Sequence, residues 1–110
     1  MKWFSIEKSS LKNQTVQSIH INGKNICLVQ FNDLYFATSN KCPHAGADIS
    51  QGWCENGHLV CPFHRYKYDL KTGRGIKGQG DYIETYPLKV EETKISIGMK
   101  ESLFHKWFKS

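Results

Sequence analysis

The sequence predicts an all-β protein, an antiparallel β-sandwich or open barrel with a loop-rich subdomain inserted between its strands. Short segments rich in β-branched and aromatic residues alternate with turn residues along most of the chain. Residues 40 to about 80 differ, because they hold seven of the nine glycines. At 110 residues the chain has the length of one small domain, so we expect a single domain over residues 1–110.

The first expected hairpin pairs residues 16–21 with residues 25–31. Asn22 and Gly23 lie between them, and both residue types tolerate the positive φ that a tight hairpin turn requires. Residues 25–31 are nearly continuously apolar, which is typical of a strand buried on both faces. A further strand over residues 34–39 follows two turn-forming residues.

A second hairpin is expected near the end of the chain, where residues 82–90 and 93–99 flank two glutamates. Strict alternation places Ile95 and Ile97 on one face of the last strand. Pro87 has no N–H to donate, so its strand is expected at a sheet edge or a bulge.

The inserted subdomain is expected to contain a small hairpin of its own. Asn56 and Gly57 predict a tight turn between residues 52–55 and residues 58–61. Residues 102–110 have the pattern of a short helix, and we expect this tail to pack against the rest of the protein.

The sequence indicates a protein of a reducing compartment. The first ten residues lack the apolar core of a signal peptide, and no apolar stretch approaches the length of a membrane span. We therefore expect a cytoplasmic protein with no membrane span, in which cysteines and histidines bind metal rather than form disulfides. The four cysteines are Cys27, Cys42, Cys54 and Cys61.

The net charge of +5 is unevenly distributed. Five basic residues lie between Arg65 and Lys77, where Asp69 is the only acidic residue. Such a segment is either a solvated basic face or a docking surface for an acidic partner. The basic residues lack a recognisable platform for single-stranded nucleic acid, so we expect no nucleic-acid binding.

Two short Cys/His pairs are the candidate metal ligands. Cys42 and His44 are separated by one residue, Cys61 and His64 by two, and sixteen residues lie between the pairs. Both zinc and iron–sulfur clusters accept two thiolates and two imidazoles. Structural zinc sites usually pair cysteine with cysteine and histidine with histidine. One Cys and one His from each loop instead suits a binuclear centre with two Cys on one iron and two His on the other.

Residues 42–73 resemble the cluster-binding region of the Rieske [2Fe–2S] family. The resemblance includes the C-x-H and C-x2-H pairs, Pro43, Gly46 and Pro62, and the ending formed by Asp69, Thr72 and Gly73. It implies the family's sandwich fold and one [2Fe–2S] cluster. Cys42 and Cys61 would bind the inner iron, and His44 and His64 would bind the outer iron with their free ring edges near solvent.

Departures from the family pattern imply a subtype with a low reduction potential. High-potential respiratory members carry two further cysteines, where this chain has Ala47 and Phe63, and a serine where it has Tyr66. Fewer hydrogen-bond donors to the cluster destabilise the extra electron of the reduced state. Tyr68 occupies a position where a donor to a cysteine sulfur occurs, although core packing explains it equally well.

The resemblance implies a carrier that passes one electron from a reductase to an oxygenase or another oxidoreductase, with no catalytic residues of its own. Docking is expected through the exposed His edge and the basic Arg65–Lys77 segment. Arg65 replaces a glycine that most members have, which leaves partner identity open. His20, His58 and His105 offer no 2-His-1-carboxylate motif for an oxygenase. Two alternatives remain, namely an accessory or regulatory subunit like the small subunit of nitrite reductase, and a redox sensor.

Overall fold

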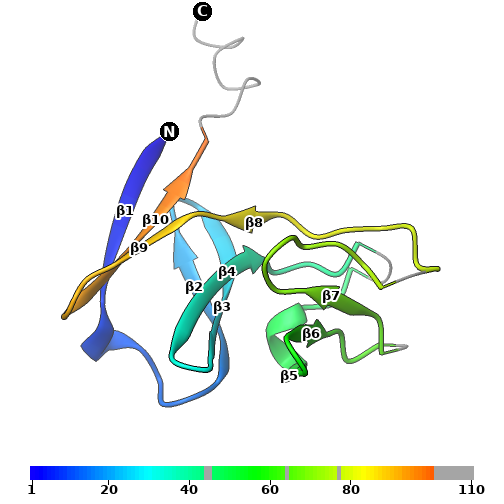
Figure 1. The fold of residues 1–110 in the computed structure, drawn as a ribbon. Coiled ribbons are helices and arrows are strands. Elements are labelled where there is room, and N and C mark those ends of the chain that lie inside the picture. Colours follow the sequence, from blue (N-terminus) through cyan, green and yellow to red (C-terminus); the bar gives the residue numbers. More distant parts are fainter. Residues whose placement is uncertain (44–45, 64, 77, 101–110) are drawn as a thin grey trace, which may run out of the picture.

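The computed structural model describes residues 1–43, 46–63, 65–76 and 78–100. The regular structure of the described residues consists of β-strands, as expected, and two short 3₁₀ helices (Figure 1). In chain order the elements are β1 (Lys2–Glu7), η1 (Lys8–Ser10), β2 (Val16–Ile21), β3 (Lys24–Phe31), β4 (Leu34–Ser39), η2 (Ile49–Gln51), β5 (Trp53–Glu55), β6 (His58–Val60), β7 (Lys67–Asp69), β8 (Thr85–Tyr86), β9 (Leu88–Val90) and β10 (Lys94–Met99).

The strands form three antiparallel sheets. Their strand orders are β1-β10-β9, β2-β3-β4-β8 and β5-β6-β7. Figure 1 shows the β5-β6-β7 sheet beside the β2-β3-β4-β8 sheet, on the side away from β1 and β9. The antiparallel all-β fold expected from the sequence is therefore confirmed.

Strand β3 separates two apolar cores. Ile26 and Leu28 pack in one core with residues of β4 and β10, whereas Cys27 and Val29 pack in the other with residues of the β5-β6-β7 region. All four side chains are buried, because successive residues of a strand point to opposite faces and both faces of β3 are covered. The apolar run of this strand thus joins the two parts of the fold.

The expected hairpins form around residues with positive φ. Asn22 and Gly23 have φ values of 52° and 76°, and Ile21 pairs with Lys24 across the turn. Asn56 has a φ of 49° in the turn between β5 and β6. These values belong to the tight hairpin turns that match the twist of paired strands.

Three features of the fold differ from the sequence prediction. Strand β1 was not expected, and it pairs with β10 along its whole length from Lys2↔Met99 to Glu7↔Lys94. Strand β7 was not expected either. The single strand expected over residues 82–90 is divided at Pro87, because β8 pairs with β4 while β9 pairs with β10. A residue without an N–H ends one ladder and lets the chain enter the other sheet.

In the described ranges, no helix is long and apolar enough to cross a membrane. The expected C-terminal helix, residues 102–110, lies outside the described residues.

Candidate metal centre

Cys42 lies in a tight loop that follows β4. Its N–H donates to the carbonyl of Ala47 over 2.8 Å, and its own carbonyl accepts from the N–H of Gly46 over 2.7 Å. Gly46 has a φ of 68°, a conformation that glycine adopts without steric cost. The backbone therefore holds the Cys42 side chain inward, where it is 1% exposed.

Asn40 closes the base of this first loop. Its carbonyl accepts the N–H of Ile49 over 2.7 Å, and its amide oxygen accepts the N–H of Ser50 over 3.0 Å. Asn40 is buried, so these bonds are shielded from competing water. Asn40 thus ties the beginning of the loop to its end at η2 through both its backbone and its side chain.

Cys61 lies in a second loop, directly after β6. Its N–H donates to the carbonyl of Tyr66 over 2.8 Å, and Arg65 within this turn has a φ of 55°. Cys61 is fully buried, whereas Phe63 two residues later is 57% exposed. The loop therefore points a thiol inward and an aromatic ring outward.

The two loops bring Cys42 and Cys61 together in one apolar core. The thiols are hydrogen-bonded to each other, and both pack in a cluster with Ile49, Leu59 and Tyr68. Burial, and after it the hydrogen bond with Cys42, raise the pKa of the Cys61 thiol to about 11. Thiolates at this point need a positive partner such as a metal ion, because a metal deprotonates the thiols that coordinate it.

A third segment, residues 73–83, packs beside the two cysteine loops. Its ends meet where the N–H of Ile83 donates to the carbonyl of Gly73 over 2.8 Å. The Tyr68 hydroxyl lies 3.5 Å from Cys42 Sγ and donates to Asp81 Oδ2 over 2.9 Å. Tyr68 is fully buried, so it both packs in the core and reaches a candidate ligand.

Cys42 and Cys61 thus lie side by side, as expected for two ligands of one iron. The other two candidate ligands, His44 and His64, and the basic residue Lys77 lie outside the described residues. Among the residues that are described, no group of three or more Cys, His, Asp or Glu gathers to hold a metal ion.

The remaining cysteines face the same core from strands rather than loops. Cys27 on β3 is fully buried, and burial raises the pKa of its thiol to about 12. Cys54 on β5 is partly buried, and burial raises the pKa of its thiol to about 11. Both are free thiols and behave as small apolar side chains.

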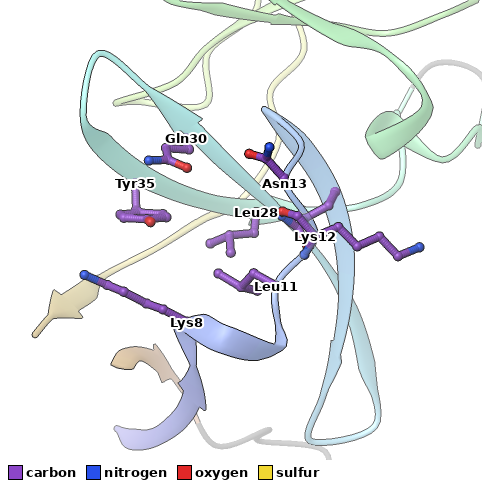
Figure 2. Close-up of a pocket in the computed structure, with 8 residues that line it drawn as sticks. Lys8, Leu11, Lys12, Asn13, Leu28, Gln30 and Tyr35 are labelled. Atoms are coloured by element: carbon purple, nitrogen blue, oxygen red, sulfur yellow. The ribbon is translucent and has the colours of Figure 1, made fainter. Parts of the chain in front are cut away.

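A separate hollow lies between η1, β3 and β4 (Figure 2). Figure 2 shows Leu11 and Leu28 at its centre, with Lys8 and Tyr35 on one side. Its volume of about 210 Å³ is below the roughly 300–1,000 Å³ of small-molecule sites. The described residues that line it include no thiol, imidazole or carboxylate, so it offers no metal ligands.

Sequence reasoning missed two residues near the cysteines, Gln79 and Asp81. Asp81 accepts the Tyr68 hydroxyl, and Gln79 Nε2 donates to Asp81 Oδ1 over 3.1 Å. Both lie in a glycine-rich loop with no periodic pattern, so spacing gives no signal for them. Gln79 and Asp81 follow Tyr68 by 11 and 13 residues in the sequence, and only the fold brings the three residues together.

The two closed loops thus bury two adjacent thiols in a small all-β protein, an arrangement that suits a metal centre. The family model described as Rieske [2Fe-2S] domain matches residues 2–87. The ferredoxin component of a naphthalene 1,2-dioxygenase system from Pseudomonas putida is 29% identical over 101 residues, which cover 90% of this chain and 97% of the relative. The ferredoxin component of naphthalene 1,2-dioxygenase/salicylate 5-hydroxylase systems from Ralstonia sp. is 33% identical over 86 residues, which cover 77% and 83%.

A solved structure shows the same fold. The ferredoxin of carbazole 1,9a-dioxygenase from Nocardioides aromaticivorans IC177 superposes with a TM-score of 0.75 at 24% identity, over 86% of this chain and 94% of that one. The chain belongs to the Rieske [2Fe–2S] domain family, and its cofactor is a Rieske-type [2Fe–2S] cluster. The buried pair of thiols fits this cofactor, since a Rieske centre takes two cysteines on one iron.

Proposed function

We propose that the protein is an electron carrier that passes one electron from a reductase to an oxygenase or another oxidoreductase. The observation that carries the proposal is the Cys42–Cys61 thiol pair, buried where two loops of a Rieske fold close. The relatives named above are ferredoxin components of dioxygenase systems, which supports the same role. The bound cluster supplies the one-electron chemistry, and the protein supplies its ligands and its surroundings.

The proposed ligands are Cys42 and Cys61 for one iron and His44 and His64 for the other. The first two are supported by their burial and mutual contact. The histidines are supported by the sequence pattern, which gives each loop one Cys and one His. Neutral imidazoles make such a centre less anionic than a four-cysteine cluster and so raise its potential.

The proposed docking surface consists of the exposed side chains on the three segments around the thiols. Phe63 and Tyr82 are 57% and 68% exposed. Two arginines, Arg65 and Arg74, lie on the same segments and are also exposed. Exposed aromatic rings on segments that also carry arginines suit a partner with an acidic rim, because aromatics that become buried supply affinity and charge supplies steering.

Spectroscopy and a reconstituted electron-transfer assay test this proposal together. After dithionite reduction, the purified protein should give an EPR signal with the low average g of a His-ligated cluster. It should also accelerate electron flow from a ferredoxin reductase to an oxygenase in proportion to its concentration. A colourless protein with one bound zinc would contradict the proposal, and so would a cluster-loaded protein that mediates no electron flow.

The reduction potential is expected in the lower half of the Rieske range of about −150 to +300 mV. The reason is the absence of sulfur at Ala47 and Phe63 and of a serine hydroxyl at Tyr66. A potentiometric EPR titration gives this value directly. A potential near the top of the range would contradict the assignment to a low-potential subtype.

A further inference from the structure

The Tyr68 hydroxyl lies between two acceptors and has only one proton to give. On one side is Cys42 Sγ at 3.5 Å, and on the other is Asp81 Oδ2 at 2.9 Å. A cysteine that binds metal is a thiolate and acts only as an acceptor. A carboxylate is likewise only an acceptor when ionised. The two groups therefore compete for the same proton.

The contact geometry favours Asp81 as the acceptor of this proton. The hydroxyl lies 2.9 Å from Asp81 Oδ2, within the usual range of an O–H···O hydrogen bond, and hydrogen bonds to ionised oxygens are the strong ones. The phenol oxygen then faces Cys42 Sγ with its lone pairs, which offer no stabilisation to a negatively charged sulfur.

Asp81 is itself held in place. Gln79 Nε2 donates to Asp81 Oδ1 over 3.1 Å, and Gln79 Oε1 accepts the N–H of Lys67 over 2.8 Å. The chain of contacts therefore runs from the β7 backbone through Gln79 and Asp81 to the Tyr68 hydroxyl. Each member has a partner on either side, so the carboxylate has a defined position.

Gly75 makes room for this arrangement. Its N–H donates to the backbone carbonyl of Asp81 over 2.9 Å. A Cβ at this position would lie 2.5 Å from Gln79 Nε2 and 2.7 Å from Asp81 Oδ1. Any larger residue would displace both side chains, so the glycine is part of the cradle that places the carboxylate beside Tyr68.

We propose that Asp81 is a positioning residue that withholds the Tyr68 proton from Cys42 and thereby keeps the reduction potential low. The inference rests on the proposed ligation of the cluster by Cys42. Reduction adds negative charge to the cluster, and a donor to the cysteine sulfur would stabilise that charge. With the proton committed to Asp81, this stabilisation is lost although the tyrosine is present.

A double-mutant cycle on the cluster-loaded protein separates this role from the direct effect of the Asp81 charge. Asp81→Asn is expected to raise the ratio of reduced to oxidised protein at a fixed potential by about tenfold. This corresponds to about 59 mV for a one-electron couple. In the Tyr68→Phe background, Asp81→Asn should raise the reduction potential only by the small amount that the loss of one negative charge produces. Tyr68→Phe alone should change the ratio by less than about twofold, but it should lower the potential when Asp81 is already Asn.

Two further variants serve as controls. Gln79→Ala leaves the charge unchanged and should raise the reduction potential less than Asp81→Asn does. This rise should disappear in the Tyr68→Phe background. Glu84→Gln removes a carboxylate directly after residues 73–83, one that accepts from the Tyr86 hydroxyl, and it measures the bare charge effect. An Asp81→Asn shift that is equal with and without the tyrosine hydroxyl would overturn the inference. The inference would also be overturned if Tyr68→Phe lowered the reduction potential as much in the presence of Asp81 as in the Asp81→Asn background.

The EPR spectrum distinguishes the two levels of failure. A protein without the Rieske signal would overturn the proposed function itself. A protein with the signal but without coupling between residues 68 and 81 would overturn only the role of Asp81. If the Asp81→Asn variant does not bind the cluster, the reduction potentials of Gln79→Ala and Tyr68→Phe still test the inference, because neither substitution alters a charged group.

Discussion

The N–H of Cys61 donates a hydrogen bond of 2.8 Å to the carbonyl oxygen of Tyr66, and this bond closes the second cysteine loop over a residue with positive φ. That residue is Arg65, with a φ of 55°. The left-handed conformation costs a residue with a side chain about 1–2 kcal/mol per position, and glycine avoids this cost. Arg65 therefore places a charge at the surface of the loop, and the loop is strained at this position.

Two substitutions at Arg65 isolate this strain. Arg65→Gly is expected to have a free energy of unfolding about 1 kcal/mol higher than that of Arg65→Ala, because alanine remains strained at a φ of 55°. Urea unfolding of the two variants measures the difference. Both lose the same charge, so both should slow electron transfer equally at low salt. If the two variants had the same free energy of unfolding, the left-handed conformation at position 65 would not strain the loop.

The buried thiol pair predicts which cysteines hold the cluster. Cys42→Ser and Cys61→Ser should each lose most of the bound iron and sulfide, because a protonated hydroxyl is a much poorer ligand for iron than a thiolate. Cys54→Ser is the matched control, since Cys54 is only partly buried and lies on a strand. Iron and sulfide analysis, together with the visible spectrum, gives the result. A cluster that survives Cys61→Ser but not Cys54→Ser would refute the ligand assignment.

Local chemistry explains which parts of the fold could be predicted. The hairpin at Asn22 and Gly23 depends on two adjacent residues that accept positive φ, so the sequence contains the whole signal. The strand over residues 25–31 is likewise evident from the sequence, because residues 26–29, which are buried on both faces, are all apolar. The cysteine spacing predicted that Cys42 and Cys61 act together at one site, and the structure places both in one core.

Long-range pairing explains what could not be predicted. Strand β1 forms only because β10 pairs with it across about ninety residues of sequence, and its alternation is weak, with Phe4 and Ile6 only partly buried. The contact between Tyr68 and Asp81 likewise joins a strand to a loop without regular structure. A prediction from periodicity has no access to either pairing.

Asp69 predicts a pH-dependent contribution to stability. The N–H groups of Thr72 and Lys71 donate to Asp69 Oδ1 and hold the pKa of its carboxyl below its ordinary value. Because the folded-state pKa is lowered, the contribution is fully present above the unfolded-state pKa of about 3.9 and is lost as pH falls through the lower folded-state value. The group is partly exposed, so we expect less than about 1 kcal/mol.

Urea unfolding at several pH values tests this contribution. Asp69→Asn should be less stable than the unmodified protein at pH 6, and the gap should close as pH falls below about 4. Asp69→Ala, which also removes the acceptor, should lose about a further 1 kcal/mol at every pH. A gap between Asp69→Asn and the unmodified protein that stays constant down to pH 3 would contradict the assigned pKa shift.

The exposed ring of Phe63 predicts how the carrier meets its partner. Phe63 is 57% exposed and lies two residues after the buried Cys61, so we expect a partner that approaches the thiol pair to contact it. Phe63→Ala is expected to raise the KM for the oxygenase about tenfold, because truncating an aromatic anchor at an interface typically costs more than 1 kcal/mol. The reduction potential should not change. Leu34→Ala is the matched control, since Leu34 is 54% exposed at the start of β4. If Leu34→Ala weakens electron transfer as much as Phe63→Ala does, the docking surface lies elsewhere.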